Sequence, residues 1–155
     1  MQEVQSGSRA DSPTADQSSD DVQVLEFKLN DEIYCVDIDY VSEIVDRTDL
    51  TVVPGAPPYV EGVIDLRGRT TTITNPKTAL GLPRNEEGKR IVIFNSERLG
   101  DGKATGWIVD EVYQVMRISM DHVDESPFAD DQTVQGVVKR EGQLLIWINP
   151  ERVGA

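Results

Sequence analysis

The stretch VEGVIDLRGRTTTITNP, Val60–Pro76, is followed 74 residues later by VQGVVKREGQLLIWINP, Val134–Pro150. Six of the 17 aligned positions are identical without a gap, including both glycines and the closing Asn-Pro. Glycine inside a β pattern marks a turn or a close approach of another backbone segment. The repeat therefore predicts two similar β lobes that turn the same corners.

A second pair of matching segments lies upstream of each copy. IDYVSEIV, Ile38–Val45, aligns with VDEVYQVM, Val109–Met116, at a shift of 71 residues. The loops before Val60 and Val134 absorb the difference of three residues. Elsewhere, short apolar runs alternate with glycines and prolines, and no amphipathic helix of 12 residues stands out. This texture predicts a mainly β, barrel-type fold with an internal pseudo-repeat.

The amino-terminal part of the chain divides into a polar segment and a predicted hairpin. Residues 1–22 are rich in Ser, Asp and Gln, and we expect them to form a disordered acidic tail because they bury too little apolar surface. Residues 23–155 then form the folded domain. LEFKL and IYCVDI alternate around Asn30-Asp31, which predicts a β-hairpin. Asp39 is expected to cap a short helical turn after it.

The net charge of −13 excludes nucleic acid as a partner, because binding it requires clustered cations. The chain holds 16 Asp, and its five Lys are outnumbered by ten Arg. This acidic balance is typical either of an ordinary solvated acidic surface or of a surface adapted to high salt, where self-repulsion is screened. We expect the second, from a halophilic archaeon. No apolar run is long enough to insert into a membrane and the acidic start is not a signal peptide, so we expect a cytoplasmic protein. Cys35 is the only cysteine, which excludes an internal disulfide.

The charged residues in the middle of the repeat differ between the copies. Arg67 aligns with Glu141, and Arg69 aligns with Gln143. Shared residues serve the shared structure, so the residues that differ are candidates for function. Arg67 is either an ordinary surface arginine or a guanidinium placed to bind a carboxylate or the backbone carbonyls of a partner.

From about Val22 to its end, the chain resembles the CheW family of chemotaxis coupling proteins. The motifs that carry the resemblance are YCVDIDYVSEIV, VPGAPPYVEGVIDLRGR and ALGL in the first half, with GWIVDEVYQVMRI and GVVKREGQLLIWINPERV in the second. The segment RTTTITNPKTALGL departs from the family pattern, which usually has apolar residues and a proline there. The start at Met1 with a short tail favours a standalone adaptor over the regulatory end of a kinase.

The resemblance implies two SH3-like, five-stranded β-barrel lobes around a shared core. It also implies a non-enzymatic adaptor without a cofactor. Such adaptors link the cytoplasmic tips of methyl-accepting chemoreceptors to the histidine kinase CheA, which carries a similar domain at its carboxyl terminus. Carried over by motif, the partner-binding residues are Val41, Glu43, Gly62 and Arg67.

A second class of function is a ligand-binding or enzymatic β-barrel protein that uses the cleft between the lobes. His122 is the only histidine, and no serine lies in a Gly-x-Ser-x-Gly motif. Neither a metal-binding set nor a phosphate-binding loop with the required ending is present. These features favour the adaptor.

Overall fold

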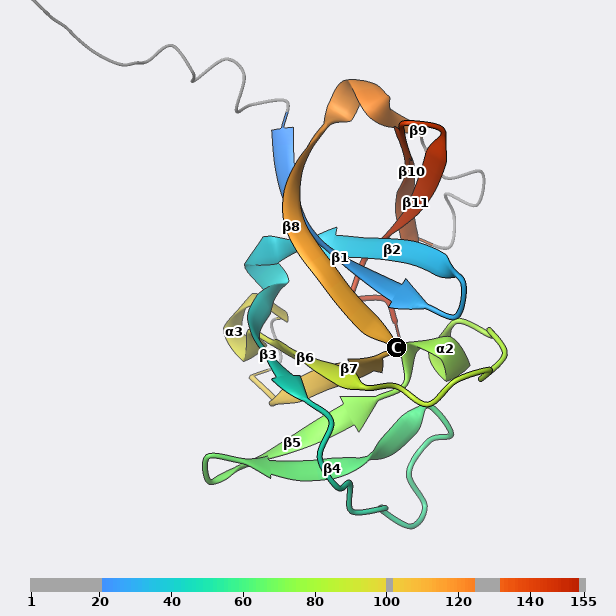
Figure 1. Cartoon of the computed structure of the whole chain (residues 1–155). Helices are drawn as coiled ribbons and strands as arrows, with labels where there is room; N and C mark the ends of the chain where they lie inside the picture. The colour runs from blue at the N-terminus through green and yellow to red at the C-terminus, as the bar shows by residue number, and fades with distance from the viewer. Residues whose placement is uncertain (1–20, 100–101, 125–131, 154–155) are drawn as a thin grey trace, which may run out of the picture.

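The computed structural model describes residues 21–99, 102–124 and 132–153 (Figure 1). Most of the polar segment expected to be a tail, residues 1–20, lies outside these ranges. The first strand begins at Asp21, two residues before the boundary that we expected from composition. Val22 packs against a buried cluster, so Asp21 and Val22 belong to the folded domain.

The molecule contains two mixed β-sheets, which we call lobe 1 and lobe 2 (Figure 1). The strands of lobe 1, in spatial order, are β3 (Val41–Asp46), β6 (Arg90–Phe94), β7 (Thr105–Val109), β5 (Arg69–Thr74) and β4 (Val60–Leu66). Those of lobe 2 are β8 (Glu111–Ser119), β1 (Asp21–Leu29), β2 (Glu32–Asp37), β11 (Gln143–Ile148), β10 (Val134–Arg140) and β9 (Val123–Asp124). Short helical segments complete the described fold: η1 (Ile38–Tyr40), α2 (Pro76–Ala79), α3 (Ser96–Leu99) and η2 (Met120–His122).

The two copies of the sequence repeat take the same place in the two sheets. Each forms an antiparallel hairpin, β4–β5 in lobe 1 and β10–β11 in lobe 2, with a register shift at the same point. The second strand of each hairpin then pairs in parallel with a strand from elsewhere in the chain, β5 with β7 and β11 with β2. The prediction of two similar lobes is therefore confirmed.

Neither lobe is a contiguous half of the chain. The hairpin β1–β2 precedes β3 in sequence but pairs with β8 and β11 in lobe 2. The hairpin β6–β7 precedes β8 but pairs with β3 and β5 in lobe 1. The chain thus passes from lobe 2 to lobe 1 at η1 and returns to lobe 2 at Asp110. The hairpin that precedes the first copy of the repeat completes the sheet of lobe 2, and the hairpin that precedes the second copy completes the sheet of lobe 1.

The lobes differ from the expected pair of five-stranded units by one short strand. In lobe 2, β9 pairs with β10 through Val137 and Asp124. At the equivalent point of lobe 1, a single bridge joins Thr51 to Val63 of β4. Both contacts bring a segment across the first strand of the hairpin, so the sixth strand extends a crossing that both lobes share.

The interior is divided into three apolar clusters. The largest lies between the lobes and includes Phe27, Phe94 and Trp107, with the ring centroids of Phe94 and Trp107 4.8 Å apart. A second cluster fills lobe 1 and a third fills lobe 2. Each lobe therefore has its own core, and the shared core holds the two together.

The first hairpin is present as predicted, while the helical turn after it is capped differently. β1 and β2 pair antiparallel around Asn30-Asp31. Asp39 lies inside η1, whose N-cap residue is Asp37 and has no side-chain cap hydrogen bond. The expected capping role of Asp39 is therefore wrong, because the turn begins two residues earlier.

Candidate functional site

The tip of the β4–β5 hairpin presents Arg67 in a left-handed backbone conformation. Arg67 has φ 52° and Gly68 has φ 85°, which fits a two-residue hairpin turn with positive φ at both positions. The Asp65 carboxylate accepts a hydrogen bond from the Gly68 N–H at 2.8 Å and steadies the turn. Glu141 and Gly142 adopt the same conformation in lobe 2, with φ of 49° and 79°. The turn therefore accommodates either charge.

Arg67 forms an ion pair with Glu43 of β3, and both side chains reach the surface. The Arg67 side chain is 67% exposed and that of Glu43 is 30% exposed. β3 and β4 are the outermost strands of the lobe 1 sheet, so the pair joins its two edges. An ion pair this exposed contributes about 0–1 kcal/mol to stability, which leaves both groups free to exchange partners at little cost.

An open groove of about 690 Å³ adjoins this ion pair. Its lining is mainly polar and includes Glu43, Arg67, Arg69, Asn95 and Glu97. Arg69 is held in place because its guanidinium donates to the Gly102 carbonyl at 2.9 Å. The groove thus offers carboxylates and guanidinium groups side by side, which suits a partner with both acidic and basic side chains.

The other two residues that we expected at the site occupy supporting positions. Val41 begins β3 and is partly buried against the shared core, two residues from Glu43. Gly62 is buried in β4, where an added Cβ would lie 2.5 Å from the Thr51 carbonyl oxygen. The structure brings Glu43 and Arg67 into contact, while Val41 and Gly62 shape the strands that carry them.

Sequence reasoning found Arg69 only as a difference between the repeats and did not find Glu97. Arg69 lies opposite Gln143 in the alignment, and this substitution was a usable signal. Glu97 lies in α3, in the first turn of a four-residue helix without a counterpart in the repeat. Its place beside the groove follows from the packing of α3, and no pattern in the sequence indicates it.

The region between the lobes contains a smaller groove of about 340 Å³. We call it the interlobe groove; its lining includes Tyr59, Phe94, Trp107, Pro150 and Glu151. This lining contains neither histidine nor cysteine. Within the described residues, no three His, Cys, Asp or Glu side chains are grouped to hold a metal ion.

The single cysteine and the single histidine of the sequence lie outside this groove. Cys35 is buried, and burial raises the pKa of its thiol to about 12, so it stays protonated and unreactive at neutral pH. His122 lies in η2 and is exposed. Among the described helices, none has the length and apolar character that a membrane crossing requires.

Comparison with known proteins identifies the family. The model of the CheW-like domain matches residues 23–155. The chain belongs to the CheW-like family. The CheW-like chain is 30% identical over 133 residues to a chemotaxis protein CheW of Thermotoga maritima, covering 84% of this chain and 86% of the relative. A chemotaxis protein CheW of Bacillus subtilis is also 30% identical, over 84% of this chain and 85% of that one.

A solved structure supports the same assignment. The crystal structure of the scaffolding protein TtCheW from Thermoanaerobacter tengcongensis superposes with a TM-score of 0.73 at 29% identity. The match covers 83% of this chain and 88% of that one. The fold is thus the CheW fold, and this CheW-like chain is a non-enzymatic adaptor of chemotaxis signalling. The resemblance inferred from the motifs is confirmed.

Proposed function

We propose that this chain couples the cytoplasmic tips of methyl-accepting chemoreceptors to the carboxyl-terminal regulatory domain of the histidine kinase CheA. It works in the cytoplasm, at arrays of membrane receptors. The observation that carries the proposal is the exposed Glu43–Arg67 ion pair beside an open polar groove at one end of lobe 1. The absence of a grouped metal-binding set among the described residues, together with the unreactive Cys35 thiol, gives the ligand-binding or enzymatic alternative no support.

The ion pair provides a contact that a partner can join. Arg67 supplies a guanidinium with several N–H donors, and Glu43 supplies acceptors beside it. A partner that offers a carboxylate to Arg67 and a donor to Glu43 forms charge-assisted hydrogen bonds at both groups. The cost of opening the internal pair is small because it is exposed, so most of the gain remains available for binding.

Val41 and Gly62 contribute to partner binding indirectly. Val41 anchors the start of β3 on the shared core, which fixes the strand that carries Glu43. Gly62 lets the Thr51 segment cross close to β4, which fixes the hairpin that carries Arg67. Substitutions at these two positions disturb the site by moving its strands.

The experiment that tests the proposal is a binding titration of the wild type and Arg67→Glu against a receptor tip and a CheA regulatory domain. Reversing the charge replaces attraction by repulsion, and losing one partner of a desolvated ion pair costs about 2–5 kcal/mol, or about 30-fold to several thousandfold in affinity. Arg117→Glu is the matched control, because Arg117 is an exposed arginine on the opposite lobe. Circular dichroism verifies folding.

A charge exchange separates two explanations of a loss. Glu43→Arg combined with Arg67→Glu restores an internal ion pair with the opposite polarity. If a partner recognises the sign of the charge at residue 67, the exchange leaves binding weak. Recovery by the exchange shows that only the integrity of the pair matters, and folded Arg67→Glu with unchanged affinity for both partners overturns the proposal.

A further inference from the structure

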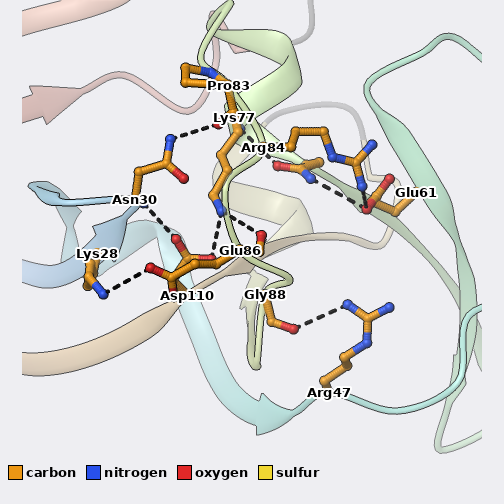
Figure 2. Close-up of polar contacts among 11 residues, drawn as sticks. Lys28, Asn30, Arg47, Glu61, Lys77, Pro83, Arg84, Glu86, Gly88 and Asp110 are labelled. Atoms are coloured by element: carbon orange, nitrogen blue, oxygen red, sulfur yellow. Dashed lines mark hydrogen bonds and ion pairs between the residues drawn. The ribbon is translucent and has the colours of Figure 1, made fainter.

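A buried lysine–aspartate pair lies where the lobes meet (Figure 2). The Lys77 ammonium is 2.8 Å from Asp110 Oδ1, and both side chains are only 2% exposed. Lys77 also donates to the Glu86 carbonyl at 2.9 Å, and Asp110 Oδ2 accepts the Asn30 N–H at 2.6 Å. Both charges therefore have hydrogen-bond partners besides each other.

The partners of this pair come from three different parts of the fold. Lys77 lies in α2 directly after β5 of lobe 1, where the Asn75 side chain caps the helix by accepting the Lys77 N–H. Asn30 belongs to the turn between β1 and β2 of lobe 2. Asp110 is the residue at which the chain passes from β7 in lobe 1 to β8 in lobe 2. The pair thus ties both lobes to the segment that crosses between them.

The loop after α2 is fastened to the same network. The Asn30 amide donates to the Pro83 carbonyl at 2.7 Å, and Lys28 lies 3.5 Å from the Glu86 carboxylate (Figure 2). These contacts join the β1–β2 hairpin of lobe 2 to a loop of lobe 1. The junction is therefore closed by polar contacts on several sides.

The junction at the pseudo-equivalent place is built differently. The sequence repeat aligns Lys77 with Glu151 and Asp110 with Asp39, so both aligned residues are acidic. There, Glu151 accepts a hydrogen bond from the Tyr40 hydroxyl, and the Arg98 guanidinium lies 4.7 Å from the Tyr40 ring centre. This second junction borders the interlobe groove, whose lining includes Glu151. One junction is sealed by a buried ion pair, and the other opens onto a groove.

A buried ion pair contributes more to geometry than to stability. Removing both charges from water costs about as much as their attraction returns, so apolar replacements of such pairs are often neutral. The hydrogen bonds nevertheless require defined distances and angles, and they are lost when the joined segments move apart. The shared core already holds the two lobes together, but apolar contacts are non-directional. The buried pair adds contacts of defined geometry between the lobes.

We propose that Lys77 and Asp110 are positioning residues, which fix the orientation of the two lobes and thereby the width of the interlobe groove at the second junction. The inference concerns the geometry of the chain itself and does not depend on which partner binds. Its consequence is that substitution of the buried pair alters a groove that neither residue lines.

The test compares the full chain with the double variant Lys77→Met, Asp110→Asn by residual dipolar couplings of the backbone amides. The double variant removes both charges together, and asparagine keeps an oxygen for the Asn30 N–H. We expect the couplings within each lobe to fit the wild-type structure, while the two lobes no longer share one orientation. Lys139→Met is the matched control, because Lys139 pairs with Asp124 on the exposed surface of lobe 2.

The resonances of fluorine-labelled tryptophan give a second readout, which a change in stability alone does not alter. The chain has two tryptophans. Trp107 lines the interlobe groove, whereas Trp147 lies in the lobe 2 core and serves as an internal reference. We expect the Trp107 resonance to shift in the double variant while that of Trp147 stays in place.

Two results overturn the proposal. A folded double variant with unchanged lobe orientation and an unchanged Trp107 resonance shows that the pair does not position the lobes. If the double variant does not fold, Lys77→Gln is measured by the same criteria. Failure of both variants to fold makes the pair a requirement for folding, which also contradicts a positioning role.

Discussion

The interiors of the two lobes contrast although their strands follow the same plan. The lobe 1 interior consists of five isoleucines, namely Ile64, Ile73, Ile91, Ile93 and Ile108. The lobe 2 interior is mixed and contains Val24, Cys35, Ile118, Val138, Leu145 and Trp147. Glu26 is buried beside them on β1, on the same strand face as Val24. The repeated backbone therefore accommodates a buried carboxylate in lobe 2, whereas the corresponding cluster of lobe 1 is apolar.

The buried carboxylate of lobe 2 is paired. The Glu26 side chain is 2% exposed and forms an ion pair with Arg140, which is 21% exposed. A second hydrogen bond joins the same two groups at 3.2 Å, and Gln114 contacts Glu26 at 3.4 Å. Strand pairing places Glu26 where lobe 1 has Ile93, and the repeat places Arg140 where lobe 1 has Leu66. Lobe 2 thus has an ion pair at the two positions where lobe 1 has apolar side chains of one cluster.

Converting lobe 2 to the lobe 1 pattern is expected to have the largest effect on stability. Arg140→Leu leaves the buried carboxylate without its cation, which costs about 3 kcal/mol, at the lower end for such losses because Arg140 is partly exposed. Adding Glu26→Ile removes the orphaned charge, so the double variant returns close to wild type. Urea unfolding measures both.

The same double variant gives the clearest test of the equivalence between the two interiors. If Arg140→Leu with Glu26→Ile stays as unstable as Arg140→Leu alone, the equivalence of the two interiors is wrong at this point. Lys139→Met is again the control, since it breaks an exposed pair on the neighbouring residue and is expected to change stability by less than about 1 kcal/mol.

Substitution of the glycine at which a segment crosses the first hairpin strand is expected to change stability by a smaller amount, and by a different amount in each lobe. A Cβ at Gly62 meets the Thr51 carbonyl oxygen at 2.5 Å, whereas a Cβ at Gly136 meets the Val123 side chain at 2.6 Å. Backbone yields less readily than a side chain, and overpacking costs about 1–3 kcal/mol. We expect Gly62→Ala near the upper end and Gly136→Ala near the lower end. Equal losses in urea unfolding would contradict this ranking.

The sequence predicts the parts of the fold that are local or repeated. The spacing of 74 residues places both hairpins, and the pair Arg67 and Glu141 marks the turn where the lobes differ. These features are visible because glycine and Asn-Pro recur where the backbone turns. The hairpin around Asn30 is equally local.

The exchange of β1–β2 and β6–β7 between the lobes could not be predicted. The residues at equivalent positions of the two hairpins have diverged, so no sequence repeat links the hairpins. Glu26 of lobe 2 corresponds to Ile93 of lobe 1, and Cys35 corresponds to Gly106. The Lys77–Asp110 pair joins residues 33 apart in sequence through a junction that only the assembled sheets create. Glu43 and Arg67 were found as separate residues, and their contact follows from the curvature that brings the sheet edges together.

Salt is expected to weaken the exposed ion pair more than the buried one. With a net charge of −13, repulsion destabilises the fold when the Debye length is about 30 Å at 0.01 M salt and much less when it is about 3 Å at 1 M. We therefore expect the melting temperature to rise with salt, as the halophile hypothesis requires. Double-mutant cycles should show the Glu43–Arg67 coupling falling with salt while the Glu26–Arg140 coupling persists. A melting temperature that is the same at both salt concentrations removes the main support of the hypothesis.

The smallest expected effect is an exchange of charge between the two hairpin turns. Arg67 and Glu141 have nearly the same φ, and each precedes a glycine with positive φ, so neither side chain is required by its turn. Glu141→Arg should change stability by less than about 0.5 kcal/mol, as exposed substitutions usually do. Arg67→Glu should cost slightly more, up to about 1 kcal/mol, because it also removes the exposed pair with Glu43. Urea unfolding of both variants measures the difference. A loss well above this value at residue 67 would mean that the ion pair holds the edges of lobe 1 together, and weaker partner binding by Arg67→Glu would then reflect a damaged lobe instead of a lost contact.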